Sequence, residues 1–353
     1  MKGRNSQGNG APSPPHSRLP GSAALRCRND VPSRQECPPP LPPRPLFNHH
    51  KGALGPSPWS LQILTFLLIT SSSIRAETQK EQIVSCSRTR SYRVHVPPLG
   101  PSTKKLPLVL VFHGGGDSAV GIEKLTKFSA LADREGFLAV YPEAVNHHWN
   151  DGRKPNPGID DVAFAGELIQ VMRIRYHADP SRIYATGFSN GAIFCHLLAE
   201  KLSGQIAAIA PVSGGIAEPF ASGFKPKHPV SVFIIHGTSD PIVKYDGGAV
   251  DHGLGGKTVP TSRALGLWLA ADACGKTPES GWLPDRVPDD HCRVQWVRWK
   301  SWRGTEVLNY RIEGGGHTWP GGKQYAPAFL VGWVCEDFDA TQVIWEFFKG
   351  HPQ

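Results

Sequence analysis

The sequence of 353 residues lacks an internal repeat, and beyond its first sixty residues it has almost no net charge. The formal net charge is +8, but residues 1–60 contain eight Lys or Arg and only two Asp or Glu. Arg75 adds one further positive charge, which leaves +1 for residues 77–353. A segment this close to neutral is not expected to bind nucleic acid or another polyphosphate.

The sequence also lacks an apolar run that would span a bilayer comfortably. Its apolar stretch at residues 61–70 has the length of a signal-peptide core, and the six residues after it end in Ala76, which suits cleavage. We therefore predict a signal peptide over residues 59–76 and a mature chain that begins near Glu77. The expected protein is secreted or periplasmic, without a stable membrane span. An uncleaved membrane anchor is the alternative.

Residues 1–58 are poor in apolar side chains and rich in Pro, Gly, Ser and Arg. Such a segment cannot bury enough apolar surface to offset the entropy that it would lose on ordering. We predict a disordered, basic, Pro-rich tail. A tail of this kind before a signal peptide is unusual, which suggests a misassigned start codon.

Cysteine is scarce, and five of the seven cysteines lie beyond the predicted signal peptide: Cys86, Cys195, Cys274, Cys292 and Cys335. An exported protein can oxidise its cysteines. Cys274 and Cys292 bracket a polar loop that contains Pro, and we expect a disulfide between them. Cys195 is expected to be a buried free thiol. Five is an odd number, so at least one cysteine stays outside any intramolecular pair.

Strand-like and helix-like segments alternate beyond the signal peptide. Almost continuous apolar runs, such as residues 106–112 and 230–235, are typical of strands buried on both faces. Other strands are expected at 92–96, 137–141, 183–187, 294–299 and 307–312, and helices at 122–135, 160–176, 261–271 and 339–348. This alternation predicts an α/β fold with a mostly parallel central sheet and helices on both faces, in a single domain over residues 77–353.

The pentapeptide from Gly187 to Gly191 has Ser189 at its centre and lies between a predicted strand and a predicted helix. This arrangement is the nucleophile elbow of the α/β-hydrolase fold. The turn is so tight that side chains at the two glycine positions would collide with neighbouring backbone, and the serine must accept strained dihedral angles. We therefore predict that Ser189 is a nucleophile.

A serine nucleophile needs a base, an acid that orients the base, and donors for the oxyanion. Gly114 and Gly115 follow the buried strand 106–112, where their amides can form an oxyanion hole with the amide of Asn190. Asp240 follows strand 230–235, and His317 lies in a glycine-rich loop after strand 307–312. The order Ser, Asp, His is that of α/β-hydrolases, and we predict these three residues as a catalytic triad.

These motifs resemble the family of secreted esterases that contains polyhydroxybutyrate depolymerases, feruloyl esterases and LpqC-type lipoproteins. The matching stretches occur in one order and cover most of residues 88–349; they are residues 113–116, 149–152, 160–162, 179–191, 236–240 and 316–321. The resemblance implies an esterase that acts on hydroxyalkanoate or aryl esters, including feruloyl esters, through Ser189, His317 and Asp240. Ala192 stands where many relatives carry a second glycine.

Other residues near these motifs receive weaker assignments. Trp149 and Trp319 are expected to contact substrate, since indole rings give rigid apolar contact beside a polar centre. The adjacent His147 and His148 have no third ligand at a suitable spacing, so we expect no metal site and no cofactor. Asp160 is expected, with the next residue, to cap a helix and hold the Trp149 loop.

We interpret the chain as a serine carboxylic-ester hydrolase with a small, oligomeric or polymeric ester as its partner. One alternative is a serine peptidase of the same fold, but the sequence shows neither an added propeller domain nor an acidic cluster for an amino terminus. The other is a polymer- or carbohydrate-binding protein without turnover. The presence of all three triad residue types argues against a pure binding protein.

Overall fold

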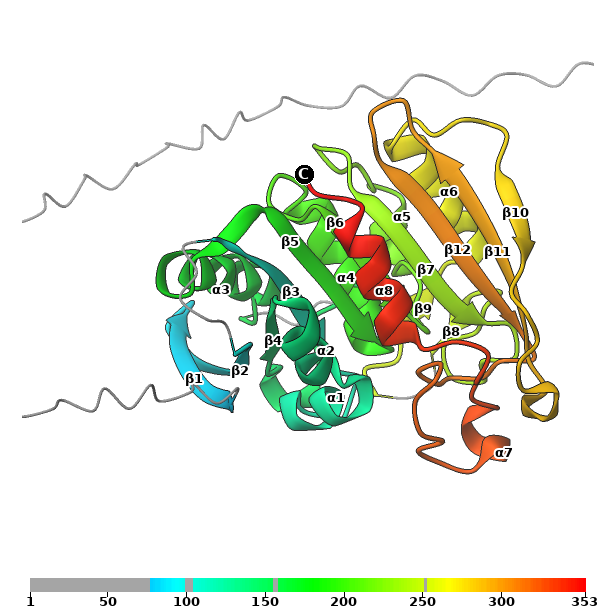
Figure 1. The fold of residues 1–353 in the computed structure, drawn as a ribbon, viewed down its shortest axis with the longest axis horizontal. Coiled ribbons are helices and arrows are strands. Elements are labelled where there is room, and N and C mark those ends of the chain that lie inside the picture. The colour runs from blue at the N-terminus through cyan, green and yellow to red at the C-terminus, as the bar shows by residue number, and fades with distance from the viewer. Residues whose placement is uncertain (1–76, 99–103, 155–157, 251–252) are drawn as a thin grey trace, which may run out of the picture. The chain divides into compact units, whose positions relative to one another are not determined.

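A computed structural model describes residues 77–98, 104–154, 158–250 and 253–353, all within one compact unit, Ile69–Gln353 (Figure 1). The predicted tail and signal peptide lie outside the described residues. Among the helices that are described, none is both long and apolar enough to cross a membrane.

The central element is a ten-stranded sheet in the order β1-β2-β4-β3-β5-β6-β7-β12-β11-β10. Its six inner strands pair in parallel, which confirms the predicted α/β class: β4 (Leu138–Pro142), β3 (Leu106–Phe112), β5 (Ala178–Phe188), β6 (Ala208–Val212), β7 (Ser231–Gly237) and β12 (Glu306–Glu313). Antiparallel strands flank them: β1 (Glu77–Ser85), β2 (Arg88–Val96), β11 (Arg293–Lys300) and β10 (Glu279–Trp282). A separate short pair joins β8 (Gly248–Ala249) to β9 (Lys257–Thr258).

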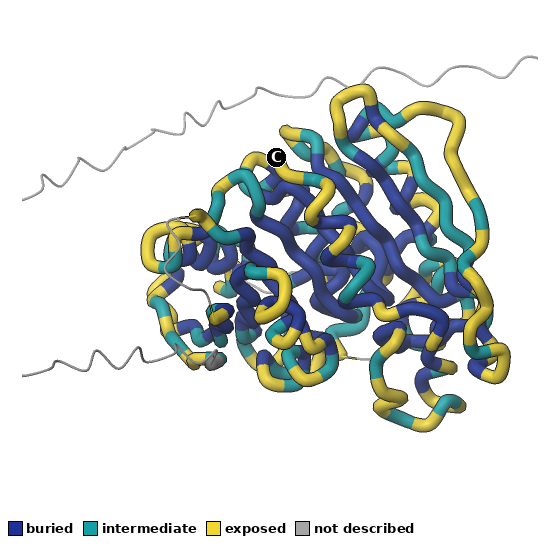
Figure 2. Tube along the Cα trace, viewed as in Figure 1, coloured by how far each residue is buried: buried dark blue, intermediate teal, exposed yellow. Residues whose placement is uncertain are grey.

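Helices cover both faces of the sheet (Figure 1). One apolar core lies under α3 (Asp161–Arg175), α4 (Asn190–Lys201) and α6 (Thr261–Ala271). The other lies under α1 (Ala119–Thr126), α2 (Phe128–Glu135) and α8 (Ala340–Lys349). Side chains alternate along each strand, so Leu108 and Leu110 of β3 enter the first core while Val109 and Val111 enter the second. Figure 2 shows the inner strands mostly buried, and every residue of β4, β6 and β7 is buried. Two short helices, α5 (Glu218–Ala221) and α7 (Ala328–Val331), lie in connections.

The structure divides one predicted helix in two and contains strands that were not predicted, β1 among them. The single helix expected at 122–135 is two helices, because Lys127 has a left-handed conformation with φ 54° and ends the first one. Strand β1 was not predicted, because most of its side chains are polar. Among the described strands it pairs only with β2, and an edge strand of this kind needs no continuous apolar pattern.

The predicted disulfide between Cys274 and Cys292 is wrong, because the two thiols are unpaired in this structure and lie at opposite ends of a strand. Cys274 forms a bridge with Ser301, which directly follows β11, whereas Cys292 directly precedes that strand. A strand of eight residues spans about 26 Å, and a disulfide joins Cα atoms no more than about 7 Å apart. Cys195 on α4 is a buried free thiol, as predicted.

The parallel strands place the predicted site residues at one edge of the sheet. β3 ends beside Gly114, β5 ends at Ser189, β7 ends shortly before Asp240, and β12 ends shortly before His317. Because the carboxyl ends of parallel strands meet at the same edge, residues separated by more than two hundred positions come together there.

Candidate active site

Ser189 occupies the sharp turn between β5 and α4 and has a strained backbone, with φ 56° and ψ −117°. Its amide donates to the carbonyl of Val212 on the neighbouring strand, at 3.0 Å. A Cβ atom added at Gly191 would lie 2.3 Å from the carbonyl oxygen of Phe112, and one added at Gly187 would lie 2.7 Å from the carbonyl of Gly191. Both glycines are therefore required by close backbone contact, as predicted from the sequence.

Asp240 and His317 form a buried hydrogen-bonded pair. His317 Nδ1 lies 2.8 Å from Asp240 Oδ2, so its N–H donates to the carboxylate and leaves Nε2 as an acceptor. The other carboxylate oxygen accepts the amides of Ile242 and Val243, each at 2.9 Å. Three donors thus hold one carboxylate in a single orientation.

His236 is a further residue of this network, and no role was predicted for it from the sequence. Its Nε2 lies 2.8 Å from the carbonyl of Val243 and 3.4 Å from Asp240 Oδ2. Burial alone raises the pKa of Asp240, but the charge of His317 and hydrogen bonds from His236 and His317 outweigh it. The pKa of Asp240 therefore lies well below its usual value, and the group is ionised near neutral pH. The only signal in the sequence is that His236 and Asp240 share one motif.

Ser189 and His317 line the same cavity, which has a volume of about 480 Å³. Gly114, Gly115 and Asn190 line it as well. The rest of its wall includes three polar or charged residues, Asp117, His148 and Arg153, but is otherwise largely apolar, with Leu125, Phe188, Ile193, Ile242, Val243, Val250, Tyr325 and Val331. A largely apolar pocket with a few polar groups is the usual form of a small-molecule site.

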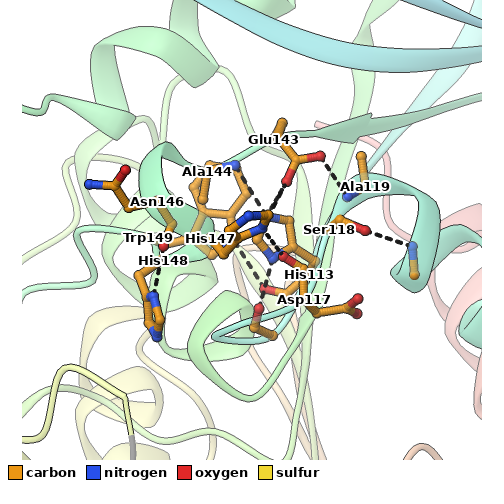
Figure 3. A network of polar contacts seen from close by, with 12 residues as sticks. His113, Asp117, Ser118, Ala119, Glu143, Ala144, Asn146, His147, His148 and Trp149 are labelled. Atoms are coloured by element: carbon orange, nitrogen blue, oxygen red, sulfur yellow. Dashed lines mark hydrogen bonds and ion pairs between the residues drawn. The ribbon is translucent and has the colours of Figure 1, made fainter.

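The glycine loop after β3 lies directly against the elbow. A Cβ atom added at Gly114 would be 3.6 Å from the Cβ of Ser189, and one at Gly115 would be 3.6 Å from the Cβ of Asn190. His113 anchors this loop (Figure 3): its Nε2 accepts the amide of Ala144 at 3.1 Å. Nδ1 must then carry the hydrogen, which it donates to the carbonyl of Gly114 at 2.7 Å. Burial lowers the pKa of His113, which favours this neutral form.

Asn190 is held by a second network that includes two residues without a predicted role, Asp151 and Arg153. Its side chain accepts the amide of Trp149 at 2.8 Å and donates to Asp151 Oδ2 at 2.6 Å. Arg153 donates to the same carboxylate oxygen from Nε and Nη2, each at 2.8 Å. Asp161 accepts the amide of Asn150 at 2.7 Å, and Asp160 caps α3 at the amide of Ala163, so both carry out the structural roles expected of them.

The expectation that Trp149 and Trp319 line the substrate site is not met. Their side chains are 0% and 1% exposed, and neither borders the cavity. Trp149 stacks on Phe194 and donates its indole N–H to the carbonyl of His113. Trp319 lies edge-on to Phe128. We assign both indoles to packing behind the loops that carry site residues.

Replacing Trp319 with alanine is therefore expected to destabilise the fold by about 3–5 kcal/mol, the usual cost of truncating a buried indole. The indole N–H also loses its acceptor, Thr341 Oγ1, at 3.1 Å. KM for a bulky ester should change no more than KM for an acetyl ester. Urea unfolding and kinetics with both esters measure this. Trp302→Ala is the control, because Trp302 is 80% exposed. A KM increase confined to bulky esters would contradict the packing assignment.

Comparison with known proteins gives a consistent set of relatives. The family model described as Esterase PHB depolymerase matches residues 90–255. NocK of Nocardia uniformis subsp. tsuyamanensis, a protein named as an esterase, is 30% identical over 289 residues, which cover 78% of this chain and 83% of NocK. Feruloyl esterase B of Piromyces equi is 28% identical over 62% of this chain and 41% of that protein.

Two further comparisons extend this set. Poly(3-hydroxyalkanoate) depolymerase C of Paucimonas lemoignei is 28% identical over 42% of this chain and 37% of its own length. The chain thus spans less than half of this relative and of the Piromyces enzyme. Among solved structures, the acetyl xylan esterase from Aspergillus awamori has a TM-score of 0.54 at 14% identity, and the match covers 77% of this chain and 99% of that one. The structural likeness shows the α/β-hydrolase fold.

Proposed function

The chain belongs to the α/β-hydrolase esterase family described as PHB depolymerase, and from this premise we propose that it is a serine carboxylic-ester hydrolase with the triad Ser189, His317 and Asp240. One observation carries the proposal. A strained serine lies on the wall of a cavity that also contains a histidine, and that histidine donates to a buried, ionised aspartate at 2.8 Å. This combination serves nucleophilic acyl transfer.

In the proposed reaction, Ser189 Oγ attacks the ester carbonyl carbon while His317 Nε2 takes the hydroxyl proton. The tetrahedral intermediate collapses, the C–O bond to the alcohol breaks, and His317 returns the proton to the leaving oxygen. Water then attacks the acyl-enzyme, again losing its proton to His317, and the acid leaves as Ser189 regains its hydrogen. Asp240 keeps the imidazole in one tautomer and stabilises its positive charge.

The proposed oxyanion hole consists of the amides of Gly114 or Gly115 and of Asn190. Support comes from the contact of the glycine loop with the elbow and from the two networks that fix His113 and Asn190. Donors that are already oriented cost no reorganisation when the negative charge develops, and each contributes about 3–4 kcal/mol in the transition state.

For the substrate, we propose hydroxyalkanoate or feruloyl and other aryl esters. Relatives named for both classes support this, as does the largely apolar cavity wall, which suits an acyl chain or an aromatic ring. The proposed steps require only side chains and backbone amides of the chain, together with water. We also propose that residues 77–353 form one exported domain after cleavage of a signal peptide at residues 59–76.

A fluorophosphonate probe tests the reaction class directly, because it reacts covalently only with an activated serine. We expect one label per molecule, on the tryptic peptide 183–201, which contains Ser189. Hydrolysis of hydroxybutyrate oligomers, methyl ferulate and short p-nitrophenyl esters then ranks the substrates. A protein that binds these esters but takes no label would be a non-catalytic binder, and faster cleavage of peptides than of esters would identify a peptidase.

Asp151→Asn tests the network behind Asn190. The variant leaves the buried Arg153 without its anionic partner and weakens the acceptor that orients Asn190. We expect kcat to fall about tenfold to a hundredfold, since small misplacements of catalytic groups have effects of this order. Stability should fall as well, because one half of a buried ion pair remains. Asp179→Asn is the control, since its pair with Arg182 is partly exposed and far weaker. An unchanged kcat would remove Asp151 from the positioning of Asn190.

A further inference from the structure

Two buried thiols lie close together outside the cavity. Cys292 is 2% exposed and Cys335 is 0% exposed. Their sulfur atoms and a carboxylate oxygen of Asp290 all lie within 4.8 Å of one another. Cys292 directly precedes β11, and Cys335 lies between α7 and α8. The sequence gives no local sign that these two cysteines meet.

We propose that Cys292 and Cys335 form an intramolecular disulfide in the oxidised protein. Each thiol loses one proton, and together they pass two electrons to an external disulfide, which is reduced to two thiols. This disulfide belongs to oxidised glutathione or to a dithiol oxidase. Because neither side chain is accessible in the folded chain, the bond forms during folding. It closes a loop that contains His317.

A metal site is the rival interpretation of this group, and the donors argue against it. Structural zinc takes four ligands, whereas the group found within the described residues offers three. Asp290 uses one carboxylate oxygen to accept the amide of Cys292 at 2.7 Å and the other to accept the amide of Glu336 at 2.6 Å. Backbone amides therefore already occupy both oxygens of the Asp290 carboxylate.

The bond would tether the segment that supports the His317 loop. This segment, residues 331–335, accepts three amides of the loop: Gly316 donates to Trp333 at 2.8 Å, His317 to Val331 at 2.5 Å, and Gly321 to Cys335 at 2.8 Å. A covalent link from Cys335 to the start of β11 restrains this segment in the unfolded chain as well as in the folded one. The expected consequence is a more stable fold around the loop that carries His317.

Peptide mapping of the full chain from an oxidising compartment tests the bond. After denaturation in iodoacetamide, trypsin separates the cysteines, because Cys292 lies in peptide 287–293, Cys335 in 324–349 and Cys274 in 264–276. We expect 287–293 joined to 324–349 without reduction, and the same link in the control Cys274→Ser. A link from 264–276 to 287–293 would overturn the proposal, as would alkylation of both thiols or zinc bound at one equivalent.

The tether has its own readout, which requires no ester substrate. Protein produced in a reducing cytosol and kept in phosphine reductant should have a Tm about 5–10 °C below that of the oxidised protein, as expected for a disulfide that closes a long loop. In Cys335→Ala the two preparations should have the same Tm. If the oxidised and the reduced wild-type protein had the same Tm, the proposed stabilisation by the disulfide would be wrong. Because neither measurement depends on hydrolysis, failure of the proposed esterase activity would leave both results unaffected.

Discussion

Ser189→Ala and Asp240→Asn are each expected to reduce kcat by at least about 10⁴-fold for every ester that the protein hydrolyses, with little change in Tm. The serine variant has no nucleophile. In the wild-type protein, His317 donates its Nδ1 hydrogen to Asp240 Oδ2 at 2.8 Å. In the aspartate variant, the amide can no longer hold His317 with its hydrogen on Nδ1. The charge that stabilises the imidazolium is lost at the same time. Steady-state kinetics and fluorophosphonate labelling measure both effects.

Asp246→Asn is the matched control for the aspartate variant, because Asp246 lies six residues further along the same connection and is exposed. Its kcat should equal that of the wild-type protein. The double variant Ser189→Ala with Asp240→Asn should be no slower than Ser189→Ala alone, since the residues act as a unit. Near-normal turnover in Asp240→Asn, with labelling still dependent on His317, would show that another carboxylate orients the base.

Gly191→Ala is expected to destabilise the protein by at least about 3 kcal/mol and to remove most of its activity, because overpacking is most costly where nothing can move aside. The added methyl group would meet two carbonyl oxygens, those of Phe112 at 2.3 Å and His113 at 2.6 Å. Phe112 is the last residue of β3, and His113 is the first residue of the glycine loop. Relief of the clash must push this loop away from Ser189. Urea unfolding and fluorophosphonate labelling rates measure the two effects.

Gly266→Ala provides the control for this change. Gly266 is also a helical glycine, in α6, and a Cβ atom added there has no neighbour within 4 Å. Alanine should leave the labelling rate unchanged and stabilise the helix by up to about 1 kcal/mol. If Gly191→Ala were as stable and as reactive as Gly266→Ala, the elbow would not need the close approach of β3 that the structure contains.

Features that depend on neighbouring residues were predictable from the sequence. The alternation of apolar runs and helical spacing predicted the parallel sheet with helices on both faces, since strand and helix periodicities are local. The two glycines of the elbow were predictable because a tight turn imposes its own steric demand. The break at Lys127 was not, because a lysine in a left-handed conformation carries no local signal.

Pairings between distant residues were decided by the tertiary structure. The sequence alone determined an α/β-hydrolase fold and the order in which Ser189, Asp240 and His317 follow their strands, because both reside in local pattern and chain order. It did not determine that Trp319 packs behind its loop, that Asp151 holds Asn190, or that Cys292 meets Cys335 rather than Cys274. These contacts depend on which strands and loops become neighbours, and that choice is made by burial over the whole chain and not by any short stretch of it.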